Sequence, residues 1–468
     1  MKERMQKIST LSDNYRQKDR TESESYAGVQ TFIGITENHL VEVQFTKDDL
    51  LERIVSPANM NRAFKQVVSN GGSGGVDKME TEALLPYLKL HKDELINSLL
   101  DGSYRPHPVR GVEIPKDGGK KRQLGIPAVV DRLIQQSISQ VLSPLYERQF
   151  SDNSFGFRPK RSSHHALRRA QSYISNGYKY CVDLDLEKFF DTVNHSKLIE
   201  ILSRTVKDGR VISLIHKYLL CGVMVGDYYE RRTQGTVQGG PLSPLLSNVM
   251  LHELDTELES RGHKFVRYAD DCMIFCMSKR SALRVKESVT TFIEKHLFLK
   301  VNLDKTCVGN VRGMKFLGYS FYFKNGECRL SVHPKSFHKL KVRLKELTGR
   351  SNGMGYDKRK SKLHLFMRGW IEYFKLADMQ KNLQNIDKWL RRRIRMCIWK
   401  CWKKVRTKFV NLKKCGISKR YAWQSANTRL GYWRIAGSVI LSSAMSNDKL
   451  KLAGYPTLME YYSKLHRK

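Results

Sequence analysis

The sequence is poor in acidic residues and has no long hydrophobic run. Asp and Glu number 46 against 83 Lys and Arg, which leaves a formal net charge of +37. Such an excess attracts a polyanion, usually nucleic acid, although an anionic membrane surface is an alternative. No stretch approaches the roughly 18 apolar residues of a membrane span, and the N-terminus lacks the apolar core of a secretion signal. We therefore expect a cytoplasmic, bacterial-type protein without a membrane partner.

The cysteines do not form the pattern of a disulfide framework. There are 9 of them, an odd number, and they are widely spread. No CxxC pair with matching partners is present, which argues against a zinc site. Cys397 and Cys401 lie four residues apart on an expected helix, where core packing explains them better than a metal does.

The composition changes along the 468 residues, a length that suggests two or three domains. Residues 1–45 are polar, and we predict an arm there. Residues 46–325 mix helical and strand patterns, which predicts an α+β (mixed α/β) body. Residues 330–425 are predicted as a basic helical domain, since Lys335 to Arg420 holds 27 Lys and Arg against 5 Asp and Glu. A short segment, 426–468, follows.

One predicted helix carries much of this basic charge. Asp387 is expected to cap its start, and Leu390, Ile394 and Cys397 continue an apolar stripe. Its other faces carry Arg391, Arg392, Arg393 and Arg395. A charge run is usually a solvated helix face. Here the imbalance is so one-sided that self-repulsion would oppose folding without a polyanion, so we predict that these arginines bind RNA.

A basic hairpin is predicted near the start of the body. Strand-like residues 109–116 and 121–127 flank Asp117-Gly118-Gly119, a sequence typical of a turn. Lys116 and Arg122 lie beside that turn. An ordinary solvated hairpin tip is the alternative to a binding role.

Two acidic segments are the strongest chemical signal. In residues 265–275, apolar strand halves flank Asp270 and Asp271, which places the pair at a tight turn. Upstream, Asp183 and Asp185 alternate with apolar residues, so both point to one face of a strand. Carboxylates from two adjacent strands can hold two metal ions about 3.5–4 Å apart, the arrangement that nucleotidyl transfer needs. Mg²⁺ prefers such oxygen ligands.

These segments resemble group II intron reverse transcriptases with a maturase function. Asp185 to Phe190 resembles the first catalytic motif of that family, and Tyr268-Ala269-Asp270-Asp271 resembles the second. Further blocks follow in family order over about residues 48–465. They are Arg105-Pro106, Ile114 to Lys116, Phe155 to Pro159, Gln238 to Pro244, Asn302 with Lys305, Phe316 to Tyr319, and Arg368 to Phe374.

The resemblance implies roles for individual residues. Asp185, Asp270 and Asp271 would bind two Mg²⁺ ions, for which Mn²⁺ can substitute. Asp183 would be a fourth ligand, an acid that contacts the ligands, or an ordinary surface acid. Lys116 and Arg122 would hold the incoming triphosphate. Phe190 would exclude a 2′-hydroxyl, although an ordinary core Phe is the alternative. The other implied sites are Gln238 at the nucleotide, Lys305 as general acid or phosphate contact, and Arg158, Tyr268, Phe316, Leu317, Gly318 and Tyr319 at template and primer.

The resemblance further implies the right-hand polymerase fold, with fingers and palm in residues 46–325 and a helical thumb, or maturase domain, in residues 330–425. The expected activity is RNA-directed DNA polymerisation with assistance to intron splicing. Its partners would be group II intron RNA, an RNA template with a DNA primer, deoxynucleotides (dNTPs) and target DNA, the last at residues 426–468. No nuclease domain is expected, because no Cys and His cluster follows Tyr432. Alternatives are a non-enzymatic splicing factor and a domesticated reverse transcriptase in host defence or repair.

Overall fold

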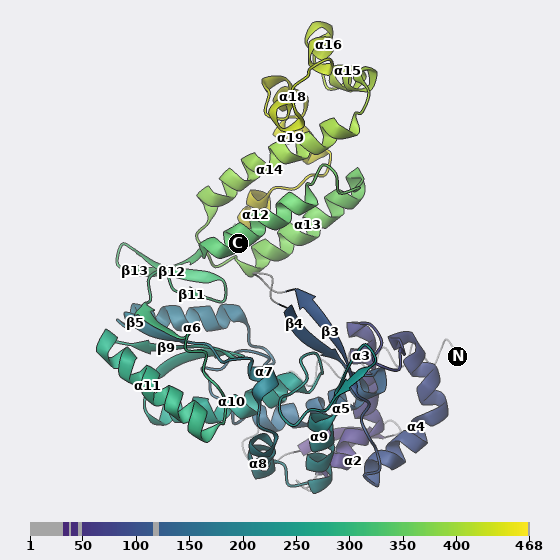
Figure 1. The fold of residues 1–468 in the computed structure, drawn as a ribbon, viewed down its shortest axis with the longest axis vertical. Helices are drawn as coiled ribbons and strands as arrows, with labels where there is room; N and C mark the ends of the chain where they lie inside the picture. The colour runs from purple at the N-terminus through teal and green to yellow at the C-terminus, as the bar shows by residue number, and fades with distance from the viewer. Residues whose placement is uncertain (1–30, 37–38, 45–48, 116–120, 467–468) are drawn as a thin grey trace. The chain divides into compact units, whose positions relative to one another are not determined.

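A computed structural model describes residues 31–36, 39–44, 49–115 and 121–466 (Figure 1). The chain divides into two compact units. The first unit comprises residues 1–150, 188–252 and 297–299, and the second comprises residues 151–187, 253–296 and 300–468. Both units contain helices and strands, which confirms the α+β class.

Helices form most of the first unit. They are α2 (Leu50–Val55), α3 (Pro57–Asn70), the 3-10 helix η2 (Thr81–Ala83), α4 (Leu84–Leu100), α5 (Val129–Glu147), α7 (Phe189–Thr192), α8 (His195–Thr205) and α9 (Gly209–Leu220). α10 (Ser243–Ser260) begins in the first unit and ends in the second. The apolar periodicity around Leu50 to Val68 suggests continuous helix, but the structure breaks it at Ser56. Pro57 starts α3, because proline lacks an N–H and fits the first turn of a helix.

The sheet of the first unit has the strand order β4-β3-β6-β7. β3 (Val109–Pro115) and β4 (Lys121–Ile126) form the predicted antiparallel hairpin, in which Ile114 pairs with Arg122. β6 (Val223–Val225) runs parallel to β3, and β7 (Tyr228–Glu230) lies at the edge. Lys116 lies outside the described residues. The predicted N-terminal arm contains an antiparallel pair that the sequence analysis did not anticipate, β1 (Thr31–Thr36) with β2 (His39–Gln44).

The second unit is built on a four-stranded antiparallel sheet of order β10-β5-β9-β8. Its strands are β5 (Tyr180–Leu184), β8 (Lys264–Tyr268), β9 (Asp271–Cys276) and β10 (Cys307–Asn310). Figure 1 shows α6 (Ser163–Ser175) and α11 (Lys279–His296) on opposite faces of this sheet. Because both faces are covered, Cys181, Val182 and Leu184 are all buried, although neighbouring strand residues point to opposite faces.

A second sheet follows in the same unit, with β11 (Lys315–Phe316), β12 (Tyr319–Lys324) and β13 (Glu327–Val332). Helices continue to the end of the described chain. They are α12 (Pro334–Leu347), α13 (Tyr356–Tyr373), α14 (Gln380–Cys401), α15 (Val405–Lys414), α16 (Lys419–Ala426), α17 (Tyr432–Ile435), α18 (Val439–Ala444), α19 (Asn447–Leu452) and α20 (Leu458–His466). No helix in the described part of the chain is long and apolar enough to cross a membrane.

The predicted role of Asp387 is wrong. α14 already begins at Gln380, so Asp387 lies inside it and is buried. Its carboxylate instead accepts hydrogen bonds from the backbone N–H groups of Leu458 (2.9 Å) and Met459 (3.0 Å). Asp387 therefore caps α20, a helix distant in sequence, because the first N–H groups of any helix need an acceptor. α20 packs against both α13 and α14.

Candidate active site

The hairpin of β8 and β9 carries the first acidic pair. Tyr268 pairs with Asp271, so only Ala269 and Asp270 connect the strands. Two-residue hairpin turns of the usual types need a positive φ at their first central residue, and Ala269 has a φ of 58°. This conformation costs a non-glycine residue roughly 1–2 kcal/mol. The prediction that Asp270 and Asp271 lie at a tight turn is confirmed.

The neighbouring strand β5 brings the second acidic pair to the same place. β5 runs antiparallel to β9 and pairs Leu184 with Cys272. Continuing this register by one residue sets Asp185 opposite Asp271. Directly opposite residues on antiparallel strands have Cβ atoms about 4.5–5.5 Å apart. Asp183 lies on the same face as Asp185, because side chains alternate along a strand.

The clustering of these acids disfavours their ionised forms. Burial, and after it the charges of Asp183 and Asp270, raise the pKa of Asp271 to about 7. Burial, and after it the charge of Asp185, raise the pKa of Asp183 to about 6. Lys315 opposes both shifts. The sheet therefore gathers more negative charge than the nearby protein cations neutralise.

Lys305 contacts this cluster directly. Its Nζ lies 2.8 Å from Oδ2 of Asp185. The segment that carries Lys305 is tied to Asp185 by the backbone, since Asn302 N–H donates to the Asp185 carbonyl (2.9 Å) and Asp185 N–H donates to Thr306 Oγ1 (3.1 Å). Within the described residues, no three Asp, Glu, His or Cys side chains converge closely enough to hold an ion. The metal-ligand role of the three aspartates thus stays a prediction.

Two residues predicted to bind the nucleotide meet within the first unit. Arg122 Nε donates to Gln238 Oε1 at 2.7 Å. The loop of Gln238 lies against β4, because Gly125 N–H donates to the Gln238 carbonyl at 2.8 Å. The next residue, Gly239, has a φ of 128°, and a Cβ there would lie 2.4 Å from the Gly125 carbonyl oxygen. Only glycine fits this close approach of two backbones.

The turn that carries Phe190 is held by the same loop. The Phe190 carbonyl accepts from Thr236 N–H at 2.6 Å, and Gly235 N–H donates to Val193 at 2.7 Å. His195 Nε2 lies 2.7 Å from the Gly235 carbonyl oxygen. The side chain of Phe190 is largely buried. The structure thus anchors this turn, and the predicted exclusion of a 2′-hydroxyl stays a prediction.

The predicted template and primer residues 316–319 form the tight connection between β11 and β12. Leu317 and Gly318 have positive φ values of 49° and 82°. The side chains of Phe316 and Tyr319 are fully buried, so they pack in the core under this connection and cannot contact a primer. The predicted contact is therefore corrected for these two side chains. Tyr373 Oη donates to the Leu317 carbonyl at 3.0 Å.

Comparison with known proteins identifies the family. Residues 114–321 match the family described as reverse transcriptase (RNA-dependent DNA polymerase), and residues 337–416 match the group II intron, maturase-specific domain. The chain is 31% identical to protein YkfC of Escherichia coli (strain K12) over 325 residues, which cover 60% of this chain and 85% of YkfC. The chain belongs to the group II intron reverse transcriptases.

Two further relatives carry intron names. The chain is 32% identical over 292 residues to the group II intron-encoded protein LtrA of Lactococcus lactis subsp. cremoris, covering 48% of this chain and 49% of LtrA. It is 29% identical over 323 residues to a putative COX1/OXI3 intron 2 protein of Saccharomyces cerevisiae, covering 55% of this chain and 37% of that protein. The chain thus spans about half the length of LtrA.

In this reverse transcriptase, the place of Arg391 disagrees with the predicted RNA contact. Arg391 is 4% exposed, and its Nη1 donates to the Tyr455 carbonyl at 3.1 Å. A buried charged group needs such a partner, and Asp387 lies one helical turn away. Arg391 therefore belongs to the core of the helical domain.

The other three arginines of α14 also donate to backbone carbonyls. The accepting oxygens belong to Trp433 (from Arg392, 2.9 Å), Thr348 (from Arg393, 2.9 Å) and Met445 (from Arg395, 2.9 Å). The guanidinium of Arg392 also lies 4.1 Å from the centre of the Trp433 ring. These three side chains are partly exposed, so their predicted RNA contacts stay predictions alongside a structural role.

The sequence analysis assigned a surface role to Arg158 and overlooked two neighbouring residues. Arg158 is buried, and its Nη1 donates to the Ser154 carbonyl at 2.9 Å, so it shapes the preceding loop. Its predicted template contact stays a prediction. Arg267 and Asp255 are fully buried and were missed. The signal was present, because an arginine interrupts the apolar strand before Tyr268 and a buried charge requires a partner.

Proposed function

We propose that this chain copies RNA into DNA with two Mg²⁺ ions and that it binds group II intron RNA to assist splicing and mobility. The observation that supports the polymerase most is the register of β5 and β9, which sets Asp185 opposite Asp271 beside the turn that carries Asp270. The substrates would be an RNA template with a DNA primer, and dNTPs.

The chemistry of the donors at the site suits divalent metal ions, although among the described residues their side chains do not converge on one point. Asp185, Asp270 and Asp271 offer carboxylate oxygens, the ligands that Mg²⁺ prefers. The raised pKa of Asp271 reflects burial and then neighbouring negative charge, and a cation would neutralise that charge. When bound, the two ions activate the primer 3′-hydroxyl and stabilise the leaving pyrophosphate, and Mn²⁺ can replace Mg²⁺. Lys305, now 2.8 Å from Asp185, would be released to contact phosphate or to donate a proton.

The remaining residues would select and hold the nucleotide. Arg122, which Gln238 orients through the hydrogen bond to its Nε, would neutralise triphosphate charge together with Lys116. Phe190, on its anchored turn, would leave no room for a 2′-hydroxyl. Tyr268, Leu317 and Gly318 would contact the template and primer.

Primer extension with a metal-ligand variant tests the polymerase. With an RNA template, a DNA primer, dNTPs and Mg²⁺, the chain should yield full-length DNA, and Asp270→Asn should reduce extension to background. Asp304→Asn is the matched control, because Asp304 is an exposed acid near the site and has no assigned role. Equal extension by Asp270→Asn would remove Asp270 from the metal site. No extension by the unsubstituted chain, with RNA binding retained, would favour a splicing factor.

The helical domain is the proposed RNA-binding surface. Residues 388–447 contain no Asp or Glu but 16 Lys and Arg, so no acid of this stretch neutralises them. Within it, Lys413 and Lys414 at the end of α15 are exposed. Target DNA would bind at residues 426–468, a segment that overlaps the end of this stretch.

Charge reversal tests the RNA-binding surface. Lys413→Glu/Lys414→Glu should weaken binding to intron RNA and lower the slope of log affinity against log salt by about 2, roughly one per lost phosphate contact. The matched control is Lys89→Glu/Lys92→Glu on α4, since both lysines are exposed in the first unit. An unchanged salt slope in the α15 variant would contradict a phosphate contact there.

A further inference from the structure

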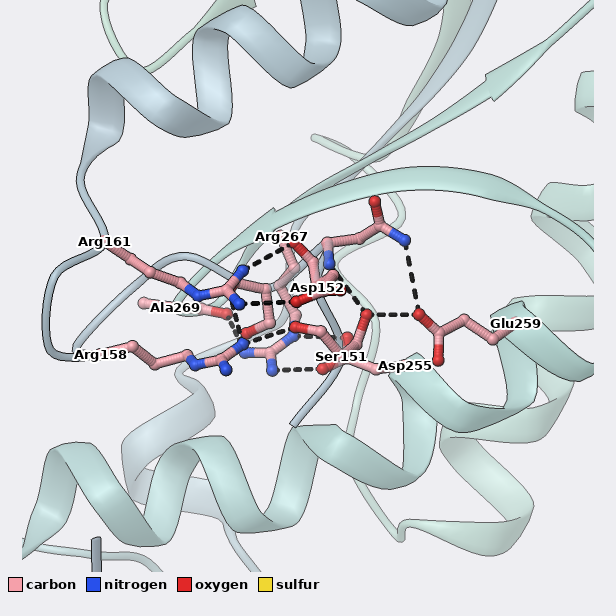
Figure 2. A network of polar contacts seen from close by, with 10 residues as sticks. Ser151, Asp152, Arg158, Arg161, Asp255, Glu259, Arg267 and Ala269 are labelled. Atoms are coloured by element: carbon pink, nitrogen blue, oxygen red, sulfur yellow. Dashed lines mark hydrogen bonds and ion pairs between the residues drawn. The ribbon is translucent and has the colours of Figure 1, made fainter. Parts of the chain in front are cut away.

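A buried arginine connects the acidic turn to α10. Arg267, in β8, donates from Nε to Asp255 Oδ1 at 2.7 Å and from Nη2 to Asp255 Oδ2 at 2.5 Å. Its Nη1 donates to the Ala269 carbonyl at 3.0 Å. Figure 2 shows the three residues at the centre of a polar network. The side chains of Arg267 and Asp255 are 1% and 0% exposed.

The carbonyl that Arg267 contacts belongs to the strained part of the turn. The peptide group between Ala269 and Asp270 includes this carbonyl, so its orientation sets where both acidic side chains leave the backbone. Ala269 holds a φ of 58°, which an alanine adopts only when its surroundings impose it. The hydrogen bond from Arg267 is such a constraint, and the planar fork of a guanidinium can bind Asp255 and this carbonyl together.

The loop before α6 braces the same turn from its backbone. Phe155 N–H donates to the Arg267 carbonyl at 2.9 Å, and Arg267 N–H donates to the Asn153 carbonyl at 2.9 Å. A Cβ on Gly156 would lie 2.2 Å from the Ala269 nitrogen. The backbone of the loop and the side chain of Arg267 thus hold one short segment from two directions.

We propose that Arg267, fixed by Asp255, is a positioning residue that holds the Ala269–Asp270 peptide in the orientation in which Asp270 and Asp271 bind metal. This inference rests on the proposed metal-dependent polymerase. Arg267 itself touches neither metal nor substrate. This positioning role gives a reason for a fully buried ion pair at a place where two apolar side chains would also pack.

The same network supplies a matched control. Arg161 Nη2 lies 2.7 Å from Asp152 Oδ1, and the Asp152 side chain is 81% exposed. This second arginine–aspartate pair lies on the bracing loop (Figure 2), whereas the Ala269 carbonyl receives its hydrogen bond from Arg267. Asp152→Asn therefore weakens an ion pair close to the turn while leaving the Ala269 carbonyl with its donor.

A direct measurement of Mn²⁺ binding distinguishes the positioning role of Arg267 from a general effect of its substitution on activity. Mn²⁺ is titrated into the chain bound to a template and a primer, and electron paramagnetic resonance measures the fraction of Mn²⁺ that is bound. The primer has a dideoxy end, so that no turnover occurs. Arg267→Lys keeps the charge, but an ammonium lacks the planar fork, so Mn²⁺ affinity should fall about 10–100-fold, the usual effect of losing a residue that orients a ligand. Primer extension should lose kcat, with KM for dNTP nearly unchanged. Asp152→Asn should match the unsubstituted chain in both assays.

A second variant keeps the test decisive if Arg267→Lys does not fold. Arg267→Met/Asp255→Leu replaces the ion pair by apolar side chains, a change that buried pairs often tolerate. If this variant folds and its Mn²⁺ affinity falls as in Arg267→Lys, positioning is supported. Normal Mn²⁺ binding by either folded variant would overturn it, and so would unfolding of both, because the pair would then serve the fold alone. Failure of the proposed function is distinguishable, since the unsubstituted chain would then show no metal-dependent extension.

Discussion

The raised pKa of Asp271 predicts that metal binding weakens on mild acidification. Burial and the neighbouring acids raise this pKa to about 7, whereas a metal ligand must be ionised. A carboxyl with that pKa is about nine-tenths ionised near pH 8 and about one-tenth ionised near pH 6. The apparent affinity for Mn²⁺ should therefore fall about tenfold between these pH values, and binding near pH 7 should release about half a proton.

The stability of the metal-free folded chain should change in the opposite direction from metal affinity when the pH falls. A carboxyl whose pKa is raised on folding binds its proton more tightly in the folded chain than in the unfolded chain. Its contribution to stability is complete below the unfolded value of about 3.9 and is lost as pH rises through about 7. The metal-free chain should thus gain stability from Asp271 when pH falls from about 7 toward 4, while it loses metal affinity.

Isothermal titration with Mn²⁺ in buffers of different ionisation enthalpy measures both the affinity and the released protons. Asp183→Asn is the informative control, because the charge of Asp183 contributes to the raised pKa of Asp271. In that variant the pH at which affinity declines should move downward. Affinity that stays constant from about pH 6 to about pH 8, with no proton release, would refute the reasoning.

Three further predictions concern single side chains. Phe190→Ala should reduce discrimination against ribonucleotides, measured as the ratio of kcat/KM for dNTP and rNTP, by about tenfold or more; an unchanged ratio would return Phe190 to core packing. Gly156→Ala should lower the free energy of unfolding by about 1–3 kcal/mol, because its Cβ would overlap the Ala269 nitrogen, and urea denaturation checks this. Asp387→Ala should cost about 0.5–2 kcal/mol in the same assay, as two N–H groups of α20 lose their acceptor; no loss would mean that water replaces the cap.

The sequence predicts the local features of the site well. The hairpin of β8 and β9 follows from apolar residues on both sides of Asp270 and Asp271, because two adjacent acids between two apolar strands are typical of a chain reversal. The hairpin of β3 and β4 follows from the turn sequence between them. Both hairpins depend on residues that are close together in the sequence, and the local hydrophobic pattern predicts structure of this kind.

Features that depend on distant partners escaped the sequence analysis. Asp387 looks like a local helix cap, yet its acceptor oxygens serve α20, some 70 residues later. Arg391 stands among other arginines in the sequence, and nothing there distinguishes it from them. Its burial is explained by the hydrogen bond that it donates to the distant carbonyl of Tyr455. Phe316 and Tyr319 resemble contact residues, but their rings fill the core beneath the turn. A charge or a ring in a sequence does not reveal whether it faces water or a distant carbonyl.

The cap that Asp387 provides has a consequence for synthesis on the ribosome. α20 fills a place against α13 and α14 that no earlier segment occupies, and Leu458 at its start is fully buried. Because the chain emerges from its N-terminus, α14 leaves the tunnel well before its partner does. During that interval the carboxylate of Asp387 and the apolar stripe beside it face solvent, next to a stretch, residues 388–447, with sixteen cations and no acid. The nascent helical domain should therefore be vulnerable to proteases and to stray RNA until α20 docks and completes it.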